Sequence, residues 1–156
     1  MVALAHQAEV INGVIQMVQA VDLPPLGTAP PDVVKRKAPK FEPGVDQPTQ
    51  ITISPGVDKE DYKPLAMSGA VRLAYPVDIT IEAPNDDDYL SNFDLYSFWR
   101  EEIRDAFRPP WLSTPIVPGA STVYDILIDP GVFLERDQVK NLADYFTIRV
   151  WCISAE

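Results

Sequence analysis

The chain has 156 residues, enough for one domain with a single hydrophobic core, and 46% of them are hydrophobic. Acidic residues outnumber basic residues 23 to 13, and the formal net charge of −10 argues against a protein that grips nucleic acid, because phosphate affinity depends on Lys and Arg. The one cysteine, Cys152, excludes an intrachain disulfide and a multi-cysteine metal site, and no apolar run reaches the ~20 residues of a membrane span.

Residues 2–21 are predicted to form an amphipathic helix. Apolar side chains recur there at a spacing of three or four residues, at Leu4, Ala8, Ile11, Ile15 and Val18. Gly13 costs such a helix ~1 kcal/mol relative to alanine, but the regular spacing outweighs this cost. The only histidine, His6, lies near the start of the chain, and we expect a solvated side chain rather than a ligand.

A proline-rich segment follows at about residues 22–48. The chain holds 16 prolines, about twice the usual ~5% share, and proline fixes the backbone and removes a hydrogen-bond donor. We therefore expect a stiff, extended arm or linker here. Within it "VVKRKA" fits an edge strand, and its basic cluster, Lys35 to Lys37, fits a solvated edge better than a nucleic-acid patch.

Two strands are predicted next. "TQITISPG" alternates Ile51 and Ile53 with polar residues and ends in a Pro-Gly turn. In "AVRLAYPVDITIEAP" every second residue is large and apolar: Val71, Leu73, Tyr75, Val77, Ile79 and Ile81. One face of this strand should therefore meet a core. Pro76 cannot donate to a ladder, so the strand should lie at an edge, or be bulged or bent there.

"NDDDYL" at residues 85–90 could be a metal cage, a catalytic acid cluster or the start of a helix. A calcium loop needs oxygen ligands at alternate positions and a glycine for its sharp bend, and this stretch has neither in register. A helical pattern begins near Tyr89, with an apolar stripe at Phe93, Tyr96, Ile103 and Phe107, and Trp99 beside it. We therefore expect the aspartates Asp86, Asp87 and Asp88 to cap the helix, which ends before Pro109.

The last two predicted strands lie in "STVYDILID" and "LADYFTIRVWCI". The first places Tyr124, Ile126 and Ile128 on one face, and the second does so with Phe146, Ile148, Val150 and Cys152. The whole order predicts an α+β fold in one domain, residues 1–156. It should be a twisted, mostly antiparallel sheet with two main helices packed on one face and a proline-rich extended arm.

No catalytic, cofactor-binding or metal-binding residues are predicted, so we do not expect an enzyme. One histidine and one cysteine offer no nucleophile–base pair, and no phosphate-binding loop or nucleophile elbow is present. An interaction protein fits better, because Trp and Tyr gather around the second helix and the last strand and are enriched at interfaces. The alternative is that these aromatic residues fill a thick core.

The loop "DPGVFLERDQ" between the last two strands is the candidate oligomer or partner interface. Phe133 and Leu134, followed by Glu135 and Arg136, stand between turn residues and charges. A loop tip should be polar unless something covers it. The alternative is that Phe133 and Leu134 fold back onto their own domain.

An N-terminal helix, the strand "PTQITISPG", the long strand "GAVRLAYPVDITIEAP", the helix "YSFWREEIRDAF" and the closing "YDILIDPGVFLERDQVKNLADYFTIRVWC" together resemble the tail terminator proteins of tailed bacteriophages, the lambda-type group. The resemblance covers most of the chain but not the proline-rich stretch at 22–48. It implies a virion structural protein of the tail or neck, assembled in the host cytoplasm as a homohexameric ring. Such a ring halts polymerisation of the tail tube and joins the tail to the head–neck connector.

The implied partners are further copies of the chain, the tail tube protein and the head–tail connector or another neck protein. DNA would pass through the channel without specific binding, and no catalytic residue is implied. Two alternatives stay open. One is another neck protein, such as a head–tail connector or a tail-completion factor; the other is a small oligomeric enzyme or ligand-binding domain with a site between subunits.

Overall fold

Two helices and six strands make up the described part of the chain. The computed structural model describes residues 6–38, 48–56, 61–64, 71–83, 92–108, 117–129 and 144–155. The helices are α1 (His6–Gln19) and α2 (Phe93–Ala106). The strands are β1 (Asp32–Lys35), β2 (Gln50–Pro55), β3 (Asp61–Pro64), β4 (Val71–Ala83), β5 (Val123–Asp129) and β6 (Asp144–Ala155).

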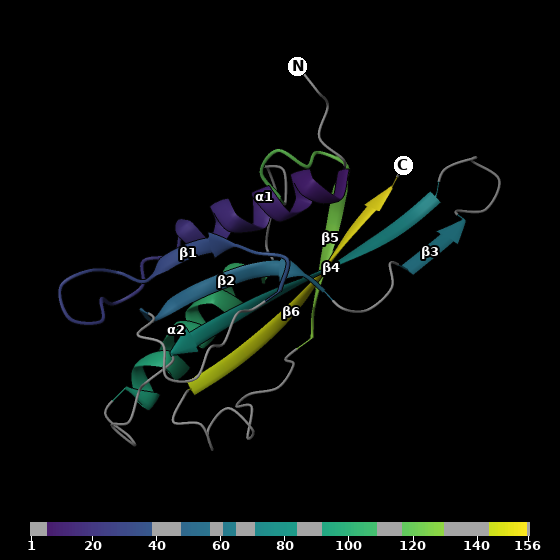
Figure 1. Cartoon of the computed structure of the whole chain (residues 1–156). Helices are drawn as coiled ribbons and strands as arrows, with labels where there is room; N and C mark the ends of the chain where they lie inside the picture. Colours follow the sequence, from purple (N-terminus) through teal and green to yellow (C-terminus); the bar gives the residue numbers. More distant parts are fainter. Residues whose placement is uncertain are drawn as a thin grey trace.

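The strands form one twisted sheet in the order β1-β2-β4-β6-β5, and β3 pairs with the first residues of β4 (Figure 1). Strands β1 and β2 run parallel, whereas the other described pairs are antiparallel. The central pair is β4 with β6, whose register runs from Arg72↔Ala155 to Ala83↔Asp144. The predicted α+β fold with a mostly antiparallel sheet is confirmed.

Both helices pack into the same hydrophobic core, on one face of the sheet. From the helices this core takes Val10 and Val14 of α1, and Trp99 and Ile103 of α2. From the sheet it takes inward side chains of four strands: Ile51, Ile53, Val77, Ile79, Ile81, Val123, Ile126, Ile148, Val150 and Cys152. Each such side chain contributes about 1.5–3 kcal/mol through burial, so this layer dominates the stability of the domain.

Helix α1 was predicted correctly as amphipathic, but its buried stripe is rotated from the expected one. Val10 and Val14 are fully buried, whereas Ala8 and Ile15 are only partly buried. Gly13 is one of the buried residues, and a Cβ added there would collide with the Val117 side chain and the Pro118 carbonyl. Glycine is therefore needed at this position because the helix approaches another segment closely, rather than being tolerated at a cost.

The first part of the proline-rich segment packs against the domain. Leu23 is 7% exposed and belongs to the core. The indole Nε1–H of Trp99, a fully buried residue of α2, donates to the Pro24 carbonyl at 2.8 Å. Strand β1 then forms an edge of the sheet, as predicted for "VVKRKA". Residues 39–47 of the expected arm lie outside the described part.

Of the possibilities expected at Pro76, an edge strand, a bulge or a bend, the edge strand was wrong, because β4 pairs with β6 on one side and with β2 and β3 on the other. Pro76 lies between the residues of β4 that pair with β2 and those that pair with β3. The β2 ladder ends at Pro55↔Val77 and the β3 ladder begins at Asp61↔Ala74, so the missing N–H of Pro76 costs no ladder bond on that side. Gly56 donates its N–H to the Pro76 carbonyl at 2.8 Å, which anchors the chain as it leaves β2.

Helix α2 begins at Phe93 and not near Tyr89. Asn92 stands at the N-cap position, without a side-chain capping bond, and the acidic residue of the first turn is Asp94. Asp86 to Asp88, which we expected to cap the helix, lie outside the described residues, and their capping role stays a prediction.

Strand β5 contains an irregularity that the alternation of apolar residues did not predict. Its register with β6 shifts between Val123 and Asp125. Ile126 therefore faces the core, as expected, but Tyr124 does not and is 49% exposed. A bulge places two residues of one strand opposite one of its partner, so the period of two fails at this point.

Candidate interaction surfaces

The outer face of the sheet, opposite the helices, is polar and buried. It carries Gln50, Thr52, Ser54, Asp78, Thr80 and Glu82, all at most 8% exposed. Gln50 donates to Glu82 across the strands at 3.0 Å. The hydroxyls of Thr52, Ser54 and Thr80, however, have no hydrogen-bond partner within the described structure. An antiparallel sheet commonly leaves such a face in contact with water. Here the face is buried, so each unpartnered hydroxyl lowers the free energy of unfolding by about 1–3 kcal/mol.

An ion pair lies in the same polar face. Arg149 of β6 bonds to both carboxylate oxygens of Asp78 in β4, at 2.6 Å from Nε and 3.0 Å from the terminal nitrogen. Burial raises the pKa of Asp78 to about 6, and the nearby Asp129 carboxylate adds to the shift. The Arg149 guanidinium favours the charged form of Asp78, whereas burial and the Asp129 carboxylate oppose that form. The protonation of Asp78, and with it the ion pair to Arg149, is therefore sensitive to mildly acidic pH.

His6 joins a polar cluster at the start of α1, so the expectation of a solvated side chain was wrong. Its Nε2 lies 2.6 Å from the Thr122 hydroxyl and 3.2 Å from the Ser154 hydroxyl. Its Nδ1 lies 3.3 Å from the Glu9 carboxylate, and its ring meets Tyr75 edge-on. Helix α1 brings His6 to the ends of β5 and β6, two elements more than 100 residues away, and sequence spacing carries no signal of this.

The same cluster has the hydroxyl–imidazole–carboxylate order of a nucleophilic triad. The Ser154 hydroxyl, however, is fully buried and donates to Thr122 at 2.8 Å. Through these contacts the cluster links the start of α1 to the ends of β5 and β6.

An apolar hollow of about 310 Å³ lies at the β5 end of the outer face. Its lining residues are Arg72, Ala74, Leu127, Trp151 and Ile153. We call this surface the β5 patch. Leu127 is 51% exposed although it is a large apolar residue, and Trp151 beside it is only partly buried. The buried Nε of Arg72 has no hydrogen-bond acceptor within the described structure.

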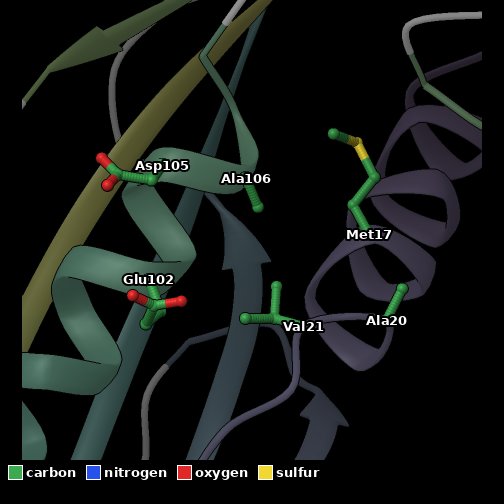
Figure 2. A pocket seen from close by; sticks show the side chains of 6 residues that line it. All are labelled: Met17, Ala20, Val21, Glu102, Asp105 and Ala106. Atoms are coloured by element: carbon green, nitrogen blue, oxygen red, sulfur yellow. The ribbon is translucent and has the colours of Figure 1, made fainter.

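A second hollow, of about 420 Å³, lies between the end of α1 and the last turn of α2 (Figure 2). Met17, Ala20, Val21 and Ala106 make it apolar, and Glu102 and Asp105 add carboxylates from α2. Figure 2 shows Ala106 directed into the space between the helices and Asp105 directed away from α1. We call this surface the helix groove.

The site residues expected from the sequence, Phe133, Leu134, Glu135 and Arg136, lie outside the described residues. We did not predict the β5 patch from the sequence, although the sequence indicates one of its residues. Leu127 alternates with Ile126 and Ile128 and therefore has to face away from the core. No sequence pattern indicates that Arg72 contributes to the patch, because its position there depends on the pairing of β4 with β6.

Within the described ranges, no group of three or more His, Cys, Asp or Glu residues is placed to hold a metal ion. No helix there is long and apolar enough to cross a bilayer. In comparisons with known proteins, no family model and no curated sequence matches the chain. The resemblance to phage tail terminators therefore rests on the order and pattern of elements quoted from the sequence.

Proposed function

We propose that this protein is a virion structural protein that assembles with copies of itself into a closed ring at the head-proximal end of a phage tail. In this role the ring, a hexamer by resemblance, ends polymerisation of the tail tube and joins the tail to the neck. Its partners are the tail tube protein and a head–tail connector. The observation that supports self-association best is the β5 patch, next to a strand that has no second strand partner among the described residues.

The two edge strands of the sheet differ in how readily they would pair with a strand of another subunit. Strand β1 spans four residues and ends in the basic cluster that begins at Lys35, and short, charged edges discourage pairing. Strand β5 spans seven residues and exposes Tyr124 and Leu127, of which Leu127 lines the hollow. Exposed apolar surface along an edge strand is typical of an interface.

The charge of the chain supports the second part of the proposal. A ring around DNA needs walls that do not bind phosphate, and a net charge of −10 repels a polyanion. Closed rings are a common outcome when one surface of a subunit contacts a different surface of the next. The same contact would serve another neck protein, and the position of the ring in a particle separates the two roles.

The experiment is a measurement of mass in solution by light scattering, on the natural chain and on Leu127→Lys. The natural chain should give a defined multimer, and Leu127→Lys should shift it to the monomer by placing a charge in the patch. Phe98→Lys is the matched control, because Phe98 is also a large exposed residue, at 43%, but lies on α2. Because both residues are exposed, both substitutions should leave the thermal midpoint of the monomer nearly unchanged.

A natural chain that stays monomeric at high concentration and within any particle would contradict the proposal. So would a multimer that Leu127→Lys leaves intact while Phe98→Lys dissolves it, because the contact would then lie on α2 and not on β5.

A further inference from the structure

His6 and Thr122 form a base–hydroxyl pair at the surface, although they are 116 positions apart in the sequence. Nε2 of His6 lies 2.6 Å from Oγ1 of Thr122. The third member of this contact, the Ser154 hydroxyl, is fully buried and donates to Thr122 Oγ1 at 2.8 Å. Thr122 is exposed, so its hydroxyl is the one that a molecule in solution can reach.

The contacts around His6 fix the direction of the hydrogen bonds. The Glu9 carboxylate can only accept, so Nδ1 of His6, 3.3 Å away, carries the ring proton toward it. In the neutral imidazole Nε2 then keeps its lone pair and accepts from the Thr122 hydroxyl. The hydrogen bonds therefore run from Ser154 through Thr122 to His6, and His6 is placed to take the Thr122 proton.

The two sides of the pair are held together by packing. Thr122 follows a turn that contains Gly119 at a φ of 75°, and Val117 and Ala120 of the same turn are fully buried in the core. Helix α1 meets this turn so closely at Gly13 that no side chain fits between them. The hydroxyl and the base are therefore oriented before any substrate arrives, which lowers the entropy cost of a reaction between them.

We propose that Thr122 is a nucleophile that takes an acyl group from a small activated ester, with His6 as its general base. A hydroxyl within hydrogen-bond reach of a base, which a third group orients in turn, is the arrangement of nucleophilic catalysis. Glu9 touches His6 but not the reacting atoms, so it acts as a positioning residue. This activity is separate from the proposed assembly, because none of these residues lines the β5 patch.

The reaction balances without a cofactor or an oxidant. Thr122 Oγ1 attacks the carbonyl carbon of the ester while its proton moves to Nε2 of His6. The bond from that carbon to the leaving alcohol then breaks, and the alcohol departs with the proton from Nε2. The products are an ester on Thr122 and the free alcohol. Water, deprotonated by the same base, later hydrolyses this ester and restores the hydroxyl.

Acetylation by p-nitrophenyl acetate tests the proposal, with release of p-nitrophenolate and peptide mass spectrometry as the two readouts. We expect an acetyl ester on Thr122 that hydroxylamine removes, whereas acetylated lysine is an amide and survives it. Thr122→Val and His6→Gln should each slow the release at least about tenfold, because general-base catalysis supplies a larger factor than this. Thr122→Ser keeps the hydroxyl and should keep the reaction.

Two further measurements separate catalysis from a structural role. An imidazole accepts a proton only when it is neutral, so acetylation of Thr122 should rise between about pH 5 and about pH 8. The titratable groups in described contact with the ring are Glu9 of α1 and Tyr75 of β4. Glu9→Ala should slow acetylation, and Glu9→Gln should recover part of it, since the amide oxygen still accepts from Nδ1.

The matched control is Ser121→Ala, which removes the neighbouring exposed hydroxyl in the same turn and should leave the release unchanged. Circular dichroism confirms that each variant is folded. Thr122→Val and Thr122→Ser change an exposed site, so this pair decides the question even where His6→Gln fails to fold.

The possible outcomes are distinct. A hydroxylamine-sensitive acetyl group on Thr122, lost in Thr122→Val and slowed in a folded His6→Gln, supports the proposal. Acetylation confined to amines, a Thr122 ester that forms equally fast in folded His6→Gln, or a rate that is flat across the pH range would overturn it. None of these results bears on ring assembly, so the proposed function stands or falls separately.

Discussion

The two faces of the sheet differ in what their burial achieves. The inner face is a continuous apolar layer under α1 and α2, so its burial stabilises the fold directly. The outer face is also buried, yet it holds the unpartnered hydroxyls of Thr52, Ser54 and Thr80 and the Asp78–Arg149 ion pair. Buried polar groups stabilise weakly and cost free energy when unpaired. The inner face therefore specifies the fold, whereas the outer face is the place to look for other demands on the sequence.

The largest expected effect belongs to the inner face. Ile79→Ala removes a fully buried side chain from the middle of the core, and we expect a loss of about 2–5 kcal/mol in the free energy of unfolding, measured with urea. Leu127→Ala, on the outer surface, should change the stability of the monomer by no more than about 0.5 kcal/mol. Similar losses for both would show that the β5 patch belongs to the core of its own subunit.

This division explains how far the sequence could predict the molecule. The inner face was predictable, because Val77, Ile79 and Ile81 alternate with polar residues and one buried face gives a period of two. The features that the sequence did not predict depend on neighbouring strands and helices. They are the bulge near Tyr124, the place of Pro76 between two partner strands, and the rotation of the buried stripe of α1. Both candidate surfaces bring together segments distant in the chain, as Arg72 with Leu127, and no local pattern contains that pairing.

A smaller effect, in the outer face, depends on pH. The pKa of Asp78 is raised from 3.8 to about 6, so the folded state takes up a proton before the unfolded state does as the pH falls. Stability should therefore rise as the pH is lowered through 6 toward 4, and fall as it is raised. Between about pH 7 and about pH 5 the natural chain should gain about 1 kcal/mol relative to Asp78→Asn, which cannot titrate there.

Urea unfolding of both proteins at the two pH values measures this difference. Parallel pH dependences would show that Asp78 keeps an ordinary pKa and that Arg149 outweighs its burial.

The smallest expected effect also lies in the outer face. Thr80→Val replaces a fully buried, unpartnered hydroxyl by a methyl group of similar size. We expect a neutral change or a gain of up to about 1 kcal/mol in the free energy of unfolding, because the desolvation cost disappears. A loss of more than about 1 kcal/mol would mean that the Thr80 hydroxyl has a hydrogen-bond partner in solution, which would weaken the contrast between the faces.

The central claim, that copies of this chain meet at the β5 patch, can be tested by thiol protection. The only natural cysteine, Cys152, is fully buried, and burial raises its pKa to about 12, so it should not react with a maleimide at neutral pH. Leu127→Cys and Phe98→Cys then each present one reactive thiol, at sites of similar exposure on β5 and α2. In the assembled protein we predict that the thiol at position 127 reacts at least about tenfold more slowly than the thiol at position 98, and that dilution to the monomer removes the difference. Equal rates at both positions in a confirmed multimer would contradict the account.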